Sequence, residues 1–567
     1  MKAILILAAL AAAGVRAEGE GFQAVLADPL AWLYADSKVE SVERMEEIDV
    51  PANGVIDVNL LLNGLKPGVP LSFFAVIVDG EWYRMRAVPV KRNTGVRGFL
   101  EKNPGDNPHV ARRAPFEVFD VLEPLPCKEI APHPDGAALA TAATVASPAE
   151  TEALRFRLDQ APSGPGARSF PIRIRVTQGE TTQELALKVN VHPVTLPPVG
   201  KASFKYTNWM DFGSMAASHG LKTWSEEHWA MIEKYVRLAT RGRQNTGMLR
   251  DVFNQNADGT VTLNKERFSR FLEIYNRAGI WYLEGGHLAS FTGGWGSPAF
   301  RTSYTTNVTT TVAGALALSK MARAYMEEIE TRGLRERWYQ HVADEPGGKN
   351  VGEYRITAGI VRRYMPGIRT VDAVEEPSFA GALDVWCPKV DAFERHRDAY
   401  DSFRTNFGDR VWCYTCCIPG GKWMNRTMDG ELLRPALIPW VAVLFDIDGF
   451  LHWGYNRWQR NQGQDPFKDP YPLKWGGSND GNSLPPGDTH IVYPGTDGPW
   501  PSARLEATRA GMEDADLLTA LRRRDRTKAD ALIRRIARGF GDYDPSCRFY
   551  REVRRDLLRA LDTAENP

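Results

Sequence analysis

Two acidic residues stand side by side at the end of a short apolar run. The run reads Trp338-Tyr339-Gln340-His341-Val342-Ala343, and Asp344, Glu345 and Pro346 follow it directly. A carboxylic acid placed against a leaving oxygen can protonate it, which is worth about 10²–10⁴ in rate. A simpler structural role is also open, because an Asp-Glu pair before Pro-Gly-Gly is often a polar loop start that caps the next helix.

The adjacency of the two carboxyl groups restricts the reaction that they can share. Two carboxyl groups usually flank a glycosidic bond that is being cleaved, whereas neighbours on a strand point to opposite faces. The pair fits a substrate-assisted scheme better, in which the 2-acetamido oxygen of the sugar attacks the anomeric carbon. Asp344 then orients the acetamido N–H, and Glu345 is the general acid. Burial and the Asp344 charge favour a proton on Glu345, and Pro346 is expected to hold Glu345 extended.

A barrel would place this pair at its mouth. Strand-like runs alternate with helical segments between residues 198 and 501, which predicts a (β/α)8 TIM-type barrel as the catalytic domain. The runs are Ser203–Trp209, Gln244–Leu249, Ile280–Leu283, Trp338–Ala343, Ile368–Ala373, Ala382–Trp386, Arg410–Tyr414 and Gly449–Trp453. Only about eight residues separate the fifth and sixth runs, too few for a crossover helix. Either that helix is missing or one strand is misplaced.

Strands also dominate the segment before the barrel. Residues 18–197 alternate apolar and polar positions with turns between them, which predicts an N-terminal β-sandwich. Asp79-Gly80, between residues 71–78 and 81–88, is a tight hairpin signal, and Gln178-Gly179 marks a second turn. Residues 502–567 are Arg-rich with apolar positions at helical spacing, which predicts a helical C-terminal extension packed on the barrel. The chain is therefore expected to be a multidomain α/β protein.

The first 17 residues have the layout of a secretory signal. Lys2 precedes a short apolar run, and Val15-Arg16-Ala17 offers small residues where a signal peptidase cuts. We expect cleavage near Ala17 and export to the periplasm or the outside; a signal anchor is the alternative. No later segment offers about 18 uninterrupted apolar residues, so we expect a soluble mature chain with no membrane span.

Composition excludes some partners and favours others. The 70 basic and 70 acidic residues cancel, whereas nucleic acid or an anionic membrane would call for a basic excess. The 16 Trp and 18 Tyr favour a glycan partner, because aromatic faces stack on sugars, although they are also ordinary core residues. Cys413-x-x-Cys416 lacks a second half-site with metal spacing, so we expect buried thiols or one disulfide, no metal and no cofactor.

Further polar and aromatic residues follow the predicted strands and would lie around the same mouth. Tyr414 is a candidate hydrogen-bond donor to the acetamido oxygen, and Trp386 and Trp453 are candidate walls of that pocket or stacking faces. We predict that His287, Asn208 and Asn456 contact sugar hydroxyls. All six also have an ordinary interpretation as core or loop residues. Glu375 and Glu376 offer a rival scheme, with one of them as a conventional nucleophile and Glu345 as acid/base.

Several stretches of the chain resemble glycoside hydrolase family 123 and the wider group of proteins that share its catalytic domain. These stretches are His341 to Pro346, Gly449 to Trp458 (GFLHWGYNRW), Val492 to Gly495, and the helix Arg504-x-Glu506-x-x-Arg509-x-Gly511-x-Glu513-Asp514. The similarity covers most of the barrel and the helix after it. It implies β-N-acetylgalactosaminidase activity by substrate-assisted, retaining hydrolysis, with Asp344 and Glu345 as the catalytic pair.

The sequence thus predicts an exported, exo-acting hexosaminidase that acts on a glycan or glycoconjugate. Two other functions stay open: a conventional retaining glycosidase, and a non-catalytic glycan-binding protein on a degenerate barrel. The galacto or gluco configuration of the sugar, the linkage and the oligomeric state are not determined by the sequence.

Overall fold

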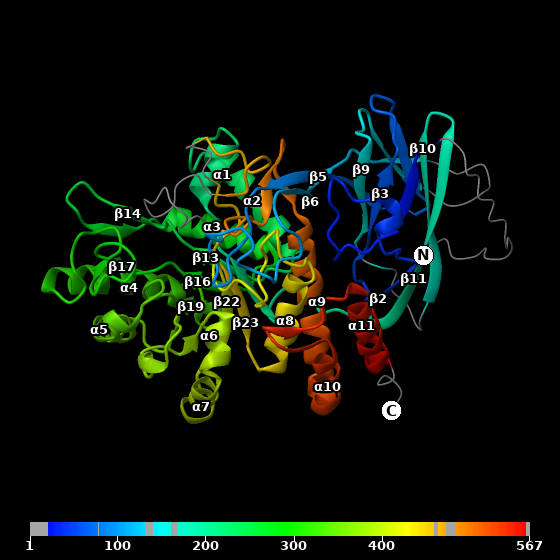
Figure 1. Ribbon diagram of the computed structural model, residues 1–567. Helices are drawn as coiled ribbons and strands as arrows, with labels where there is room; N and C mark the ends of the chain where they lie inside the picture. The colour runs from blue at the N-terminus through cyan, green and yellow to red at the C-terminus, as the bar shows by residue number, and fades with distance from the viewer. Residues whose placement is uncertain are drawn as a thin grey trace.

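The computed structural model describes residues 21–77, 79–130, 140–159, 161, 168–458, 463–471 and 484–562. The predicted signal peptide, residues 1–17, lies outside these ranges. Figure 1 shows two bodies, with N-terminal strands on the right and a larger α/β body on the left, and helix α9 between them. The chain is a mixed α/β protein, as predicted.

The N-terminal part consists of two β-sheets. One has the strand order β1-β3-β9-β5-β6 and the other the order β2-β11-β10-β4-β8-β7. The strands are β1 (Gln23–Ala27), β2 (Glu47–Ala52), β3 (Ile56–Asn63), β4 (Leu71–Ala75), β5 (Glu81–Val90), β6 (Phe116–Pro124), β7 (Lys128–Ile130), β8 (Ala140–Val145), β9 (Thr151–Leu158), β10 (Arg168–Gln178) and β11 (Thr181–Thr195). Both sheets contribute apolar side chains to one core, which agrees with the period-two alternation of the sequence.

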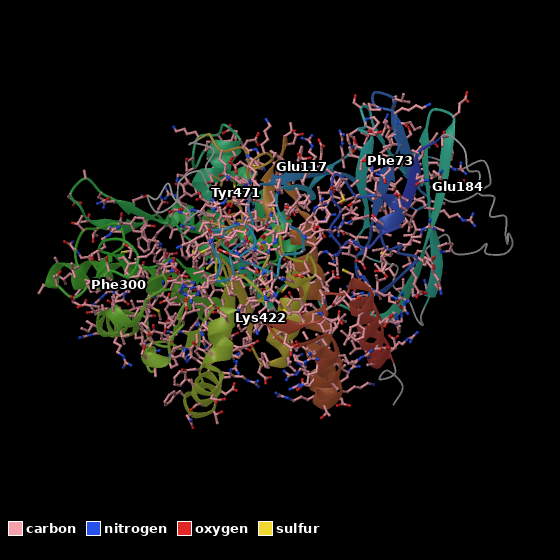
Figure 2. All side chains as sticks on the ribbon, viewed as in Figure 1. Phe73, Glu117, Glu184, Phe300, Lys422 and Tyr471 are labelled. Carbon is pink, nitrogen blue, oxygen red and sulfur yellow. The ribbon has the colours of Figure 1, made fainter. Side chains whose placement is uncertain are left out.

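One of the two predicted hairpins forms and the other does not. β10 and β11 are antiparallel partners from Gln178 and Thr181 onward. β4 and β5, on either side of Asp79-Gly80, belong to different sheets instead, with β4 between β8 and β10. The prediction was wrong because the Asp79-Gly80 signal indicates that the chain reverses direction. It does not determine that β4 and β5 pair with each other. Crossing between the sheets lets Phe73 of β4 (Figure 2) meet Trp82 of β5, with ring centroids 4.7 Å apart.

The larger body contains eight parallel strands, and each overlaps one of the predicted runs. They are β12 (Lys205–Asn208), β13 (Thr246–Leu249), β16 (Tyr282–Gly285), β19 (Trp338–Gln340), β20 (Arg369–Asp372), β21 (Val385–Trp386), β22 (Arg410–Thr415) and β23 (Gly449–His452). Their order is β12-β23-β22-β21-β20-β19-β16-β13. Asn245, just before β13, donates its backbone N–H to Tyr206 O of β12 at 3.3 Å and nearly closes the barrel.

The short link between the fifth and sixth strands is also explained. A single 3₁₀ turn (Pro377–Phe379) joins β20 to β21, so the crossover helix is missing and both strands were placed correctly. The helices around the barrel are α1 (Phe212–Ser218), α2 (Glu226–Arg241), α3 (Lys265–Ala278), α4 (Val312–Thr331), α5 (Val351–Tyr364), α6 (Val390–Arg395), α7 (Arg397–Phe407) and α8 (Arg434–Leu444). Short strand pairs lie in the connecting loops: β14 (Phe253–Gln255) with β15 (Val261–Leu263), β17 (Ala289–Phe291) with β18 (Phe300–Thr302), and β24 (Val492–Pro494) with β25 (Pro499–Pro501).

The C-terminal region is helical but is not a simple appendage. It contains α9 (Ala503–Arg524), α10 (Arg526–Ile536), the short pair β26 (Ala537–Gly539) and β27 (Asp542–Tyr543), and α11 (Cys547–Asp562). α9 packs closely on α8, because a Cβ at Gly511 would lie only 2.3 Å from the carbonyl oxygen of Ala436. α11 lies against strands β2 and β11 of the N-terminal part. The helices therefore join the barrel to the N-terminal sheets (Figure 1).

Charged residues of α9 fill the junction between the two bodies. Arg504 lies against Asp120 of β6, with Nη2 2.9 Å from Oδ2. Arg509 contacts Asp57 of β3 at 3.2 Å and Glu513 of its own helix at 2.9 Å. All of these side chains are buried, so the charged motif of this helix holds the barrel to the N-terminal sheets.

Two smaller expectations concern the helices and the thiols. None of the helices within the described ranges combines the length and the apolarity that a bilayer crossing requires. All six cysteines are free thiols, and Cys387, Cys413 and Cys416 are buried. The predicted alternative of one disulfide is therefore wrong, and the expectation of buried thiols holds for three of the six.

Candidate active site

Asp344 and Glu345 lie at the carboxyl end of the fourth barrel strand. Ala343, just before them, bridges in parallel to Ala289, so the wall of the barrel continues up to the pair. Each acidic side chain is half-buried, with 36% and 35% of its surface exposed. Both carboxyl groups therefore reach the open end of the barrel from a fixed backbone.

The backbone of Glu345 is not extended as its proline neighbour suggested. Its φ is +45°, in the left-handed region that costs a non-glycine residue about 1–3 kcal/mol and is enriched at functional sites. The prediction from Pro346 was wrong, because Pro disfavours the right-handed helical region of the preceding residue but does not by itself impose a strand. The turn reaims the Glu345 side chain relative to that of Asp344.

A buried carboxylate holds the end of the strand in place. Asp372, the last residue of β20, accepts hydrogen bonds from the backbone N–H groups of Val342 and Ala343 at 3.0 and 3.2 Å. Tyr354 of α5 donates its hydroxyl to the same oxygen at 2.5 Å. Val342 and Ala343, the two residues directly before the pair, are thereby tied to the neighbouring strand.

Beneath the pair lies a buried imidazolium. His341 Nδ1 is 3.0 Å from Asp372 Oδ1, and His341 Nε2 is 3.1 Å from Glu284 Oε1 of β16. Burial opposes the charge, but the hydrogen bonds to the two carboxylates raise the pKa of His341 to about 10. Thr207 donates to the other oxygen of Glu284 at 2.6 Å. His341 is therefore a permanent cation, and its charge acts to lower the pKa of Asp344.

Asp344 lies beside a neutral histidine. His287 Nε2 is 3.8 Å from Asp344 Oδ1. The pKa of His287 lies well below its usual value because the ring is desolvated and faces the His341 cation. Although the Asp344 side chain is partly exposed, crowding by protein atoms and repulsion from Glu345 raise its pKa to about 7. Near neutral pH the carboxyl group of Asp344 is therefore only partly ionised.

Glu345 faces a different set of partners. Tyr414 of β22 donates its hydroxyl to Glu345 Oε1 at 2.6 Å, and burial raises the pKa of Tyr414 well above 10, so the phenol keeps its proton. Lys389 Nζ is 3.9 Å from the same Glu345 oxygen and also forms an ion pair with Glu375. These contacts fix the position of the Glu345 carboxyl group while leaving a third of it exposed.

Three predicted binding residues do not reach the mouth. The Trp386 ring stacks on Phe403 of α7 with centroids 4.7 Å apart, and its Nε1 donates to Asp409 at 2.9 Å. Because β21 turns Val385 and not Trp386 into the barrel, the prediction for Trp386 was wrong. Its place is the layer between the barrel and the helices.

The two predicted asparagines serve the fold. Asn208 is buried, donates to Tyr206 and accepts from Arg426 Nη1 at 2.6 Å. Asn456 is buried and exchanges two hydrogen bonds of 2.9 Å with the backbone of Asp211. Both side chains are buried and bonded to other protein groups, so neither faces a sugar. Both predictions are therefore corrected: the amides complete loops of the barrel.

Trp453 lies at the rim together with a carboxyl group that sequence reasoning missed. Its ring is partly buried and packs against the barrel interior near Tyr414. It hydrogen-bonds Asp488, whose pKa burial and the Glu345 charge help raise to about 7. His452 Nε2 is 3.5 Å from Asp488 Oδ1. Asp488 lies in a loop 35 residues after Trp453 in a segment without periodicity, so no local signal identified it.

Three other site residues could have been predicted, because they lie at or just after the ends of barrel strands. Asp372 is the last residue of β20, and Lys389 follows β21 by three positions. Trp209 follows β12 and lies edge-on to His287 and His341, with ring centroids 5.3 and 5.4 Å away. A search for every polar or aromatic residue within three positions of a strand end would have found all three.

A metal is not needed to explain the histidine cluster. Within the described ranges, His287, His341 and Asp372 are close enough to hold an ion, with ligand atoms within 4.8 Å of one another. However, both nitrogens of His341 are in hydrogen bonds to carboxylates, which leaves no free lone pair for a metal. The cluster therefore fits an ion-pair network under the acidic pair. Glu345 is placed to transfer a proton. The neighbouring Asp344 carboxyl group is placed to accept a hydrogen bond from a polar N–H.

Comparisons with known proteins match one family model and several solved structures. The family model described as glycoside hydrolase 123, catalytic domain, matches residues 209–521. A family 123 glycoside hydrolase from Clostridium perfringens has a similar structure, with a TM-score of 0.65 and 11% identity over 96% of this chain and 97% of the other. A termite-gut GH10 xylanase with a bacterial Ig-like domain gives a TM-score of 0.32 and 12% identity over 64% of this chain and 90% of the other. Comparison with curated protein sequences finds no match.

Proposed function

The chain belongs to glycoside hydrolase family 123, and on that basis we propose that it removes terminal β-linked 2-acetamido sugars, above all N-acetylgalactosamine, by substrate-assisted, retaining hydrolysis. The observation that carries the proposal is the pair Asp344 and Glu345 at the end of the fourth strand, aimed differently by the φ of +45° at Glu345. The similar Clostridium perfringens enzyme is described for glycolipid glycan hydrolysis, which supports a glycoconjugate substrate for this chain as well.

In the first half of the proposed reaction the substrate supplies the nucleophile. The acetamido N–H donates to the Asp344 carboxylate, and the acetamido oxygen forms a bond to the anomeric carbon. The bond from that carbon to the leaving oxygen breaks, and Glu345 gives its proton to the leaving oxygen. Positive charge develops on the acetamido group next to Asp344. His287 is neutral and therefore does not repel that positive charge.

In the second half Glu345 acts as the base. It takes a proton from water, whose oxygen attacks the anomeric carbon from the side that the leaving group vacated, and the acetamido oxygen is released. Two displacements at one carbon give net retention of configuration. Tyr414 and Lys389 hold the Glu345 carboxyl group in position for both steps, and Trp453 is a candidate wall of the sugar pocket.

The pH dependence of this reaction follows from the raised pKa of Asp344. The proposed reaction uses Asp344 as a carboxylate, and a carboxyl group with a pKa of about 7 keeps its proton below that pH. Below about pH 7 we therefore expect kcat/KM to fall with falling pH, approaching tenfold per pH unit, since protonated Asp344 no longer accepts from the acetamido N–H as a carboxylate. A pH profile of kcat/KM on an aryl 2-acetamido glycoside measures this limb. A kcat/KM that stays constant between pH 7 and 5 would contradict this role of Asp344.

The decisive experiment compares substrates with and without the 2-acetamido group. We expect turnover of aryl 2-acetamido-2-deoxy-β-galactosides and little of the matched aryl galactosides. Asp344→Asn should lower kcat/KM on the 2-acetamido substrate by about 10²–10³, because it removes a charge that stabilises the acetamido group. Equal activity on both substrates, or no effect of Asp344→Asn, would refute substrate assistance.

Two further measurements separate this proposal from the two other functions. A conventional retaining glycosidase would form a covalent sugar adduct on Glu375 or Glu376, visible by mass spectrometry with a slow fluorosugar, whereas the substrate-assisted enzyme forms none. The ion pair of Glu375 with Lys389 is compatible with a nucleophile, so this alternative deserves the direct test. A non-catalytic glycan-binding protein would show affinity without turnover.

We further propose that the protein acts after export, with a signal peptide removed near Ala17. The apolar run after Lys2 and the small residues before the cut support this. N-terminal sequencing of protein secreted by its own host would test the site of cleavage.

A further inference from the structure

A hairpin extends the wall of the barrel beside the catalytic pair. Strands β17 and β18 follow the third barrel strand, and Ala289 at the start of β17 donates its N–H to Val342 O at 2.9 Å. The same residue bridges to Ala343, the neighbour of Asp344. The base of the hairpin is therefore fixed directly alongside the pair, and Phe291 lies about 7 Å further along the strand. Phe300, the partner of Phe291, marks this hairpin at the far left of the molecule in Figure 2.

The tip of the hairpin presents a tryptophan to solvent. Trp295 lies in a turn rich in glycine and has 62% of its surface exposed. Its ring meets Phe291 edge-on with centroids 5.3 Å apart, and Phe291 in turn stacks on Phe300 at 5.2 Å. The contact with Phe291 supports the indole ring, and most of the Trp295 surface stays exposed to solvent. A single exposed apolar residue is ordinary by itself, so its relation to the acid decides its meaning.

The loop of Trp295 is tied to the chain that follows the general acid. Asn350 is buried, and its Nδ2 donates to Ser297 O at 3.1 Å. Its Oδ1 accepts from the N–H of Gly347, two residues after Glu345, at 3.0 Å. One amide therefore couples the tip of the hairpin to the loop that leaves Glu345. Because Glu345 protonates the leaving oxygen, the departing part of the substrate lies on the side of Glu345.

We propose that Trp295 forms a leaving-group subsite that stacks on a pyranose ring of the departing glycan. The inference rests on the proposed function and adds that the natural substrate is an oligosaccharide or its conjugate, not a single sugar on a small aglycone. The C–H face of a pyranose fits a flat indole, and the fixed hairpin presents that indole without having to order a mobile side chain first.

The test compares two substrates that differ only in the leaving group. One is the methyl glycoside of the 2-acetamido sugar, which has no second ring, and the other is an oligosaccharide that ends in the same sugar. In Trp295→Ala we expect the ratio of kcat/KM for the oligosaccharide to kcat/KM for the methyl glycoside to fall about tenfold. Trp295→Phe, which keeps a flat ring, should restore most of the ratio. Phe407→Ala is the matched control, because Phe407 at the end of α7 is equally exposed, at 64%, and the ratio should not change.

Each outcome bears on the subsite separately from the proposed function. An unchanged ratio in Trp295→Ala, or an equal loss on both substrates, would overturn the subsite while leaving the hydrolase intact. Absence of turnover of any glycoside by the wild-type protein would refute the proposed function instead. In that case calorimetry would measure how tightly the two variants bind the oligosaccharide. Weaker binding by Trp295→Ala than by Phe407→Ala would support the subsite, and equal binding would overturn it.

Discussion

Glu345→Gln is expected to lower kcat/KM on aryl 2-acetamido-2-deoxy-galactosides by about 10²–10⁴. Glutamine keeps the shape of the side chain and an oxygen that accepts from Tyr414, which donates to Glu345 at 2.6 Å in the wild-type protein. It cannot give a proton to the leaving oxygen or take one from water, so both halves of the proposed reaction fail. Steady-state assays with a leaving group of high pKa show the effect best, because such a group depends most on protonation.

Glu376→Gln is the matched control for this experiment. Glu376 lies in the loop after the next strand, and its contact with Ser378 Oγ is a weak 3.4 Å. The same change of a carboxyl group to an amide should leave kcat/KM near the wild-type value. Near wild-type activity of Glu345→Gln, in protein with an unchanged melting temperature, would remove Glu345 from the mechanism. A comparable loss with both variants would favour the conventional scheme, in which Glu376 is the nucleophile and Glu345 the acid/base.

Arg509→Ala is expected to destabilise the protein by about 3–5 kcal/mol, which is typical when one member of a buried ion network is removed. Arg509 of α9 is 3% exposed and contacts Asp57, Glu506 and Glu513. Burial opposes the charge of Asp57, but Arg155 and Arg509 lower the pKa of that carboxyl group below its usual value. Without Arg509 these carboxylates lose a counterion in a site that water does not reach. Denaturant unfolding followed by circular dichroism measures the loss.

Arg538→Ala provides the surface comparison. Arg538 pairs with Asp542 at 2.8 Å, and both side chains are more than half exposed, so solvent screens the interaction and little stability should be lost. Equal stability of the Arg509 and Arg538 variants would show that the junction between the barrel and the N-terminal sheets does not depend on its buried charges. A separate unfolding step of the N-terminal sheets in Arg509→Ala would instead identify α9 as the connection between the two bodies.

The family motif on this helix shows how a sequence pattern can be right for a reason that the sequence does not reveal. Arg504, Glu506, Arg509 and Glu513 resemble the family pattern, and their spacing alone indicated only a charged helix. The structure places all four in the interior, where they meet Asp57, Asp120 and Arg157 from strands some 350 to 450 residues earlier. Local sequence patterns cannot predict those partners. Ion pairs between residues so far apart in the sequence depend on how the barrel and the N-terminal sheets pack together.

The sequence by itself determined the barrel strands and the position of the acidic pair. Each of the eight predicted runs overlaps a strand of the barrel, because short apolar runs between helical segments fit a parallel sheet that is covered on both sides. It also determined that Asp344 and Glu345 lie just beyond the fourth strand, β19, since Pro346 cannot continue a sheet. Period-two alternation predicted the N-terminal sheets, but the pairing of β4 and β5 was decided by the core that Phe73 and Trp82 share.

Only the tertiary structure decided which residues surround the pair and in what state. Trp386 ends β21 and Tyr414 is next to last in β22, yet Trp386 faces the helices and Tyr414 faces Glu345. Alternate residues of a strand point to opposite sides, so a shift of one position exchanges the two faces. Hydrogen bonds to Glu284 and Asp372 keep His341 charged, and burial together with the Glu345 charge raises the pKa of Asp344. The acidic pair of the sequence therefore acquires its electrostatic surroundings only through groups that other strands bring to it.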